Sequence, residues 1–590
     1  MRHLSLTGSL IAFALLVNFP ALASAISPPA ERVHRVSAAA IAGTVRSAQD
    51  GPMEGVVVIA QRQGTSILTA VSTDSLGRFE FPRDHVPRGS YIMAIRATGY
   101  RWSEPAKSKI IKVAGNFAPE LDVTLSPVAD KSQLASQLTS LEWLNSFPGS
   151  RQQKDALYHN VVNCGFCHSL ERVASSRHTT EEFRSVIQRM ATYEPDHSSA
   201  DRVQIASTPA PIEGLQWWGS DVKAMAEYLA SVNLSGGKPT WGYPLKLMPR
   251  PQGKATRAIV TVFPIPRPQS IIHDLDVDSK GNVWYGNTSW DFIGRFEPAT
   301  GKFSEWPAPN FLPPAAPNVD RILGVQDIQV DSDDHVWAAI GGTKLAMFAP
   351  KSAQWESFDV PVVWLNPFRA PVHRGQRAIW VTGVTQAVDG ARHEAAFRLD
   401  FARGKVGRAI PLFEGLAPPD DHAHAHPLHY CYMMDQDVAG NFLCTNPGGS
   451  LLMRADFRSS RVRMIPTITP FAYPRRGYRD DQNRFWFGEF YADKIGVIDL
   501  NTDAVKEYDT HFKYLSPYYA RPDQNGNVWV SSTGSDRLLR LDPKTGTIVQ
   551  YLMPVPYDAR KVVVDTTSKT ITVWLPNKNA AQLIRVEVPD

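Results

Sequence analysis

Residues 164–168 have the sequence Cys-Gly-Phe-Cys-His, a C-x-x-C-H pattern that serves as the attachment site of a c-type haem. The thiols of Cys164 and Cys167, three positions apart on one helical turn, lie close enough to form thioethers with the two vinyl groups of a haem. The imidazole of His168 then faces the iron as its proximal ligand. The pattern predicts one covalently bound haem c per chain.

A thioredoxin-like redox pair and half of a zinc site are the alternatives for these cysteines. A zinc site needs two further ligands, and the other cysteines, Cys431 and Cys444, are far away in the sequence. A redox C-x-x-C normally opens the helix after the first strand of a βαβ unit. Here the pattern falls within a predicted helical stretch, 153–170, with no strand before it, so haem attachment is favoured.

The N-terminus and the charge balance agree with an exported protein. Residues 1–25 have a basic start, an apolar run at 10–17 and an A-x-A site at 23–25, the features of a secretory signal peptide. An uncleaved anchor is the alternative, although the run is short for a membrane span. Haem is attached outside the cytoplasm, so we expect a periplasmic or secreted protein that does not span the membrane after cleavage. The 62 basic and 58 acidic residues form no basic tract, which argues against nucleic-acid binding.

The chain as a whole is expected to be multidomain and mainly β. Short strands separated by turn residues predict a small antiparallel β-sandwich at 38–127. It contains a G-x-V start, a T-D-x-x-G-x-F hairpin at 73–79, a G-x-Y strand at 89–91 and a terminal Gly-Tyr at 99–100. These features resemble the carboxypeptidase regulatory-like domain. The resemblance implies a non-catalytic spacer or docking module.

Helical periodicity replaces the strand pattern at 132–235, which predicts a short all-α domain. Thr179 and Glu182 form a capping-box pattern, and apolar residues follow at i, i+3, i+4 and i+7 up to Met190. Pro195 is expected to end this helix. Together the haem motif, this helix and a closing helix at 220–229 resemble a class I c-type cytochrome of about a hundred residues.

A low-spin electron-transfer haem needs a sixth ligand, and the candidates are Met190, Met225, His178 and His197. We predict Met190, because it ends the apolar stripe that must face the haem. The resemblance implies that the helix of Met225 packs away from the iron, and His178 precedes the helix cap. Class I cytochromes place this methionine nearer the last helix, and 194–219 contains none. A core methionine packed on the haem edge is the alternative role for Met190.

The region 255–590 repeats an apolar strand, an Asp-containing turn and a tryptophan-bearing strand, 43 to 63 residues apart. Seven such units predict a seven-bladed β-propeller. Residues 257–263 precede the first unit as an isolated strand and are expected to complete blade seven. The aligned positions are Trp284, Trp337, Trp380, Leu443, Trp486, Trp529 and Trp574.

The segments Lys-Ile-Gly-Val-Ile-Asp at 494–499 and Asp-Phe-Ile-Gly-Arg-Phe at 291–296 resemble the recurring strand of the virginiamycin B lyase (streptogramin lyase) propeller. The family's catalytic pair is a histidine and a glutamate fourteen residues apart, working with magnesium. Glu489 fits the acid, but Arg475 occupies the histidine position, and arginine is not a general base near neutral pH. In blade one, His273 is present but Asn287 replaces the acid. No blade contains the pair, so lyase activity is not expected.

These positions still point toward the propeller axis. His273, Arg475, Glu489 and Tyr518 are therefore candidates for a polar funnel that binds an anionic or hydroxylated small molecule. A water-filled channel is the alternative interpretation.

The longest interval between units contains Asp420, Asp421, His422, His424, His426 and His429. Alternation places His422, His424 and His426 on one side of an extended strand, a spacing that a second metal can use. A solvated loop, or one that covers the haem domain, is the alternative.

Cys431 and Cys444 are expected on neighbouring strands, where an oxidising compartment favours a disulfide and cross-strand geometry opposes it.

The sequence leaves three interpretations of the function. The first is a periplasmic c-type cytochrome whose propeller binds a substrate or partner, with a redox protein or a small molecule as electron donor. The second is a propeller enzyme, either an oxidoreductase that delivers electrons to its own haem or a lyase. A binding protein that uses haem as a sensor is a third interpretation.

Overall fold

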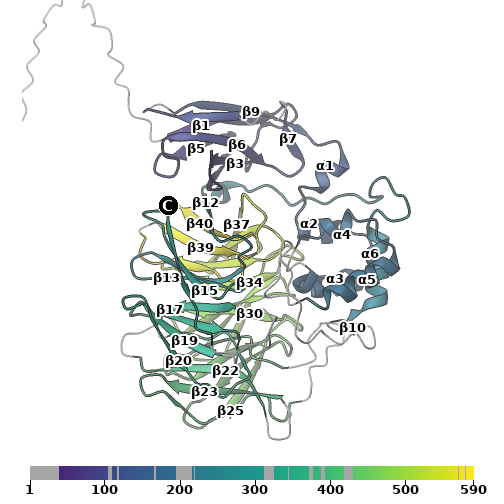
Figure 1. Ribbon diagram of the computed structural model, residues 1–590. Helices are drawn as coiled ribbons and strands as arrows, with labels where there is room; N and C mark the ends of the chain where they lie inside the picture. Colours follow the sequence, from purple (N-terminus) through teal and green to yellow (C-terminus); the bar gives the residue numbers. More distant parts are fainter. Residues whose placement is uncertain are drawn as a thin grey trace, which may run out of the picture.

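The computed structural model describes residues 39–103, 109–115, 118–164, 168–193, 216–217, 220–310, 324–342, 344–370, 376–386, 392–416, 429–568, 570–578 and 580–589. The predicted signal peptide, Cys167, His197 and the tract 420–426 lie outside these residues. Figure 1 shows a β-sandwich above a ring of sheets, with a helical module beside both. We call these parts the sandwich module (39–127), the helical module (131–232) and the propeller (259–589).

The sandwich module has two sheets over a core that includes Val58, Phe81 and Tyr91. The first sheet has the order β2-β1-β9-β7 with β5 also on β1, and the second has the order β4-β3-β6-β8. Contrary to the antiparallel expectation, β1 and β9 run parallel, because the chain enters β9 by crossing over from the second sheet. The strands are β1 (Ala39–Ser47), β2 (Gly51–Pro52), β3 (Val57–Arg62), β4 (Leu68–Ser72), β5 (Arg78–Pro82), β6 (Gly89–Arg96), β7 (Tyr100–Trp102), β8 (Lys109–Val113) and β9 (Glu120–Pro127).

The helical module surrounds a core that includes Trp143, Leu157, Ile187 and Leu229. The predicted capping box of Thr179 and Glu182 is present at the start of α5. This helix ends at Met190, before Pro195, and α3 ends at Cys164 rather than continuing to 170. The elements are α1 (Lys131–Ala135), α2 (Ser140–Ser146), α3 (Arg151–Cys164), α4 (Glu171–Ala174), α5 (Thr180–Met190), β10 (Gln216–Trp217), β11 (Ser220–Asp221) and α6 (Val222–Val232).

The propeller consists of seven successive blades of antiparallel strands; blades five and six share one sheet, and blade seven shares a sheet with the sandwich module. Blades one to three contain β13 (Ile272–Val277), β14 (Val283–Asn287), β15 (Phe292–Glu297), β16 (Lys302–Pro307), β17 (Val325–Val330), β18 (Val336–Ile340), β19 (Lys344–Ala349), β20 (Gln354–Phe358), β21 (Trp364–Leu365), β22 (Ala378–Gln386), β23 (Arg392–Asp400), β24 (Lys405–Val406) and β25 (Ile410–Pro411). Blades four and five contain β26 (Met433–Gln436), β27 (Phe442–Asn446), β28 (Leu451–Ala455), β29 (Val462–Pro466), β30 (Pro474–Arg479), β31 (Arg484–Glu489), β32 (Lys494–Asp499) and β33 (Val505–Asp509). Blades six and seven contain β34 (Pro517–Pro522), β35 (Val528–Ser532), β36 (Arg537–Asp542), β37 (Thr547–Leu552), β38 (Val563–Asp565), β39 (Ile571–Asn577), β40 (Gln582–Val588) and β12 (Ile259–Pro264).

The spacing of the repeat has a physical cause. In blade one, Asp278 accepts hydrogen bonds from the backbone N–H groups of Lys280 and Asn282, which fixes the turn, while its second carboxylate oxygen accepts from the Trp284 indole at 3.0 Å. Blades two, five and six repeat the Asp–Trp hydrogen bond at 2.8–2.9 Å. One carboxylate thus ties the turn to a buried indole, which satisfies a donor that would otherwise be costly to bury.

Strand β12 closes the ring, as expected, and also joins the sandwich module to it. It pairs antiparallel with β40 on one side and with β4 on the other, so blade seven continues into the second sandwich sheet. A further contact crosses the same boundary, where His85 Nε2 lies 2.6 Å from Glu587 Oε2.

The helical module docks on the propeller through α3. The hydroxyl of Tyr158 donates to the Phe490 carbonyl at 2.5 Å and lies 3.1 Å from both Asp493 Oδ1 and Ser516 Oγ. Its ring stacks on Phe490 at 5.9 Å between centroids and meets Tyr514 edge-on. Burial of these polar groups is tolerated because each one has a partner.

We predict that Tyr158→Phe destabilises the docked helical module by about 1–3 kcal/mol, because it leaves the buried partners of the hydroxyl unsatisfied. Hydrogen exchange should quicken in the propeller segments 490–493 and 514–516. The matched control is Tyr243→Phe, because the Tyr243 hydroxyl donates to Val232 within the helical module. Equal exchange in these segments in wild type and Tyr158→Phe would contradict the assigned docking role.

The sandwich–propeller boundary should depend on pH. The hydrogen bond to Glu587 raises the pKa of His85 above its ordinary value, so the contribution is complete below about pH 6.5 and is lost as pH rises through the folded-state pKa. We expect His85→Gln to cost about 1–2 kcal/mol at pH 6 and less at pH 9, measured by thermal melting. The control is His393→Gln, at an exposed site. A His85→Gln cost that did not change with pH would refute this coupling.

Candidate functional site

The C-x-x-C-H pattern starts at the last residue of α3, about two turns after Tyr158, which contacts the propeller. Gly165, Phe166 and Cys167 lie outside the described residues, and of Cys164 only the backbone is described. His168 follows, ahead of α4. The helix that carries the first cysteine is therefore held by the propeller itself.

His168 has the properties of a neutral metal ligand. Its Nδ1 lies 2.9 Å from the Ser169 carbonyl oxygen. When Nδ1 carries the proton it donates to this carbonyl, and Nε2 keeps its lone pair for a metal. Burial lowers the pKa of His168 below its ordinary value, which favours the neutral ring. This side chain fits the proximal position of a c-type haem.

The four candidates for the sixth ligand occupy different surroundings. Met190 is half-buried at the end of α5, one turn after the buried Ile187. Met225 is buried inside the core of the helical module, and His178 is exposed, with its ring edge-on to Phe183. His197 lies outside the described residues. Met190 as the ligand stays a prediction, because no described contact joins it to His168.

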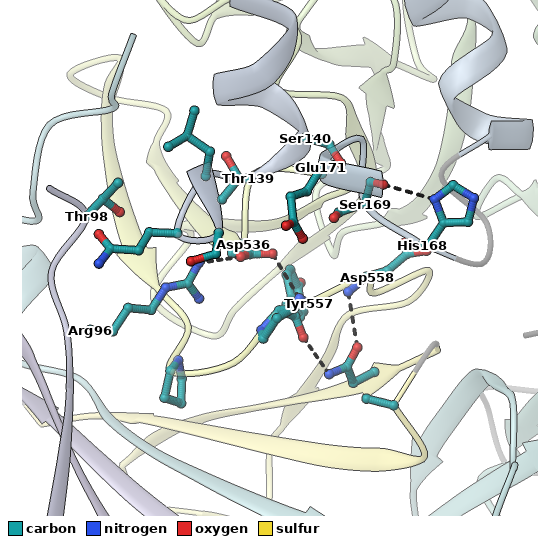
Figure 2. Close-up of a pocket in the computed structure, with 18 of the residues that line it drawn as sticks. Arg96, Thr98, Thr139, Ser140, His168, Ser169, Glu171, Asp536, Tyr557 and Asp558 are labelled. Atoms are coloured by element: carbon teal, nitrogen blue, oxygen red, sulfur yellow. Dashed lines mark hydrogen bonds and ion pairs between the residues drawn. The ribbon is translucent and has the colours of Figure 1, made fainter. Parts of the chain in front are cut away.

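A cavity of about 550 Å³ lies beside His168, where the three modules meet (Figure 2). In the view of Figure 2 the His168 ring lies at the rim and points away from Asp536 and Tyr557. The lining includes Arg96 and Thr98 of the sandwich module, Thr139, Ser140, Ser169 and Glu171 of the helical module, and Asp536, Tyr557, Asp558, Arg560 and Asn577 of the propeller. Sequence reasoning missed this cavity, because its walls come from segments more than 400 residues apart.

Charged side chains from several blades form buried ion pairs at the propeller axis. Arg476 of blade five makes two hydrogen bonds to Asp274 of blade one, at 2.6 and 2.9 Å, and one to Asp327 of blade two, at 3.0 Å. Lys561 of blade seven approaches Asp274 at 3.8 Å. These buried ion pairs connect blades across the axis, and breaking one would leave an uncompensated charge.

The predicted funnel residues are brought together only in part. Arg475 and Tyr518 meet: the guanidinium of Arg475 lies 4.5–5.3 Å from the ring centres of Tyr432, Tyr473, Phe490 and Tyr518. His273 instead lies against Asp274, with its Nδ1 2.7 Å from the carboxylate. All four funnel residues are at most 5% exposed, so the side chains fill this part of the axis rather than line an open funnel.

Glu489 of blade five has a strongly raised pKa. Burial and the neighbouring Glu507 raise its pKa to about 9, so the side chain is protonated near neutral pH. Neither carboxyl oxygen has a hydrogen-bond partner among the described residues. With Glu489 protonated and an arginine, Arg475, at the histidine position of the lyase family, these two residues do not form an acid–base pair.

Other metal and redox candidates gain no support. Cys431 and Cys444 are both buried free thiols, so the structure has no disulfide between them. Burial raises the pKa of each thiol. His429 lies near Asn446, with its Nδ1 2.9 Å from Nδ2. Within the described ranges, no group of three histidine, cysteine or acidic side chains is arranged to hold a metal ion. No described helix is long and apolar enough to cross a membrane.

Residues 40–126 match the family model described as the carboxypeptidase regulatory-like domain, which confirms the resemblance of the sandwich module. A sequence search of curated proteins found no match. A streptogramin B lyase structure is 17% identical over 57% of this chain and 100% of its own, with a TM-score of 0.46. A virginiamycin B lyase from Staphylococcus aureus is 16% identical over 56% of this chain and 100% of its own, with a TM-score of 0.42. The chain is thus similar to β-propellers of this type at low identity.

Proposed function

We propose that the protein is a periplasmic or secreted c-type cytochrome that transfers electrons through one covalent haem, with the propeller as its substrate- or partner-binding module. The observation that carries the proposal is the C-x-x-C-H pattern at the end of α3, whose histidine has its Nδ1 2.9 Å from the backbone carbonyl oxygen of Ser169. The electron donor is a redox protein or a small molecule.

In this proposal a bound haem supplies reversible one-electron chemistry at its iron. Cys164 and Cys167 anchor the group covalently, His168 binds through Nε2, and Met190 provides the sixth ligand. The carbonyl of Ser169 holds the His168 ring in one tautomer and one orientation. Attachment thus depends on side chains within a short segment that α3 positions.

The docking contacts place the motif-bearing helix against the propeller. Tyr158 of α3 stacks on Phe490, and the guanidinium of Arg475 lies 5.0 Å from the centre of the same Phe490 ring. Phe490 thus lies between Arg475 and Tyr158, and a molecule bound on the propeller side of this ring would be separated from the motif-bearing helix by it. An oxidoreductase differs from a carrier only in receiving its electrons from such a molecule. No comparable observation favours a lyase.

The first prediction concerns stoichiometry. Protein exported with the cytochrome c maturation machinery should contain one haem per chain by pyridine haemochrome and intact mass. Cys164→Ala with Cys167→Ala should abolish covalent attachment, because both thioethers are lost. The control is Cys431→Ala with Cys444→Ala, which removes the buried thiols of blade four and should leave the haem content unchanged. Two haems per chain, or full attachment in the Cys164 and Cys167 variant, would contradict the proposal.

The second prediction concerns the sixth ligand. Met190→Ala should abolish the weak far-red sulfur-to-iron charge-transfer band of the ferric protein and lower the reduction potential, because a thioether ligand raises it relative to histidine. Met225→Leu, in the core of the helical module, should keep the band. If Met190→Ala retains both the band and the low-spin spectrum, another residue is the ligand.

A further inference from the structure

Of the described residues assigned to the haem, only His168 lines the cavity at the junction of the three modules. Its volume of about 550 Å³ falls in the range of small-molecule sites, which often lie between domains. Figure 2 shows the Glu171 carboxylate pointing from α4 into this cavity. The chemistry of the wall therefore indicates what class of molecule would bind.

The two guanidinium groups in the wall are already used by the protein. Arg96 pairs with Asp536 and donates to the carbonyls of Met553 and Val555 at 2.8 and 3.1 Å. Arg560 pairs with Asp558 at 2.9 Å. A ligand anion would have to compete with these pairs, so the wall does not favour one.

The unused groups favour a cation. The side chain of Glu171 forms no ion pair or hydrogen bond with any described residue, and its carboxylate is the third acid of the wall against two arginines. Tyr557, only 3% exposed, has a hydroxyl without a hydrogen-bond partner in the described part of the chain. Such a buried hydroxyl is costly to leave unpaired, so a polar ligand group would stabilise it. The hydroxyls of Thr98, Ser169 and Thr533 add further donors and acceptors.

We propose that this cavity binds a small organic amine that carries hydroxyl groups. Its ammonium group pairs with Glu171, and its hydroxyl groups bond to Tyr557 and to the hydroxyls of the wall. The apolar side chains of Ile59, Ile95 and Leu138 cover its carbon skeleton. Because His168 forms the rim, the bound amine lies beside the residue assigned to the iron; this last link alone rests on the proposed function.

Three probes with the same ring and different charge test the site: glucosamine, glucose and glucuronate, titrated calorimetrically into the full-length protein near pH 6.5. We expect glucosamine to bind at least tenfold more tightly than glucose, and glucuronate more weakly than both. Glu171→Gln should weaken glucosamine binding about tenfold and leave glucose unchanged. The control Glu181→Gln, on the exposed face of α5, should change neither.

The variant that lacks Cys164 and Cys167 should bind glucosamine as wild type does, which separates this site from the haem proposal. A blue or red shift of the haem absorption on saturation would show the link to His168. Equal binding of the three sugars, tighter binding of glucuronate, no measurable binding at about 10 mM, or an unchanged affinity in Glu171→Gln would each overturn the assignment.

Discussion

Strand β12 is hydrogen-bonded along both edges, and the arrangement of the molecule depends on it. One edge completes blade seven through β40, and the other extends the sheet into the sandwich module through β4. An isolated blade edge would be an open template for pairing with other chains, so the sandwich covers an edge while it docks. The same junction brings Arg96 of the sandwich to Asp536 of blade six, which builds one wall of the cavity beside His168.

The helical module is held by a different kind of contact. Asp493 accepts backbone hydrogen bonds from Leu515 at 2.7 Å and from Tyr514 at 2.8 Å, and the Tyr158 hydroxyl completes this buried network. Burial raises the pKa of Asp493 to about 6, which shows how far the site is withdrawn from water. These buried polar contacts hold the helix that carries the C-x-x-C-H pattern against the propeller.

Local regularities in the sequence predicted the parts of this fold that local chemistry determines. The Asp and Trp positions of the repeat, the capping box of Thr179 and the closing strand at 257–263 were all found, because each uses a short pattern with one physical solution. The parallel pairing of β1 and β9 and the sheet that joins β12 to β4 were not, because neither leaves a signature within one segment.

The residues of the candidate site also fall into those that the sequence could predict and those that it could not. Cys164, Cys167 and His168 are adjacent in sequence and needed no tertiary information to be recognised. The predicted funnel is not open, because its four side chains are buried, and His273 lies against Asp274, its neighbour in the same strand. Glu171 and Tyr557, nearly 400 residues apart, carry no local signal and meet only through the docking of the modules.

Electron transfer through a single haem is tested most directly by an optical redox titration of the exported protein. The reduced-minus-oxidised spectrum should follow one reversible Nernst curve with n = 1, in which a tenfold change in the ratio of oxidised to reduced protein corresponds to about 59 mV. No change in haem absorbance over the accessible range of potential, or a titration that requires two components, would contradict it.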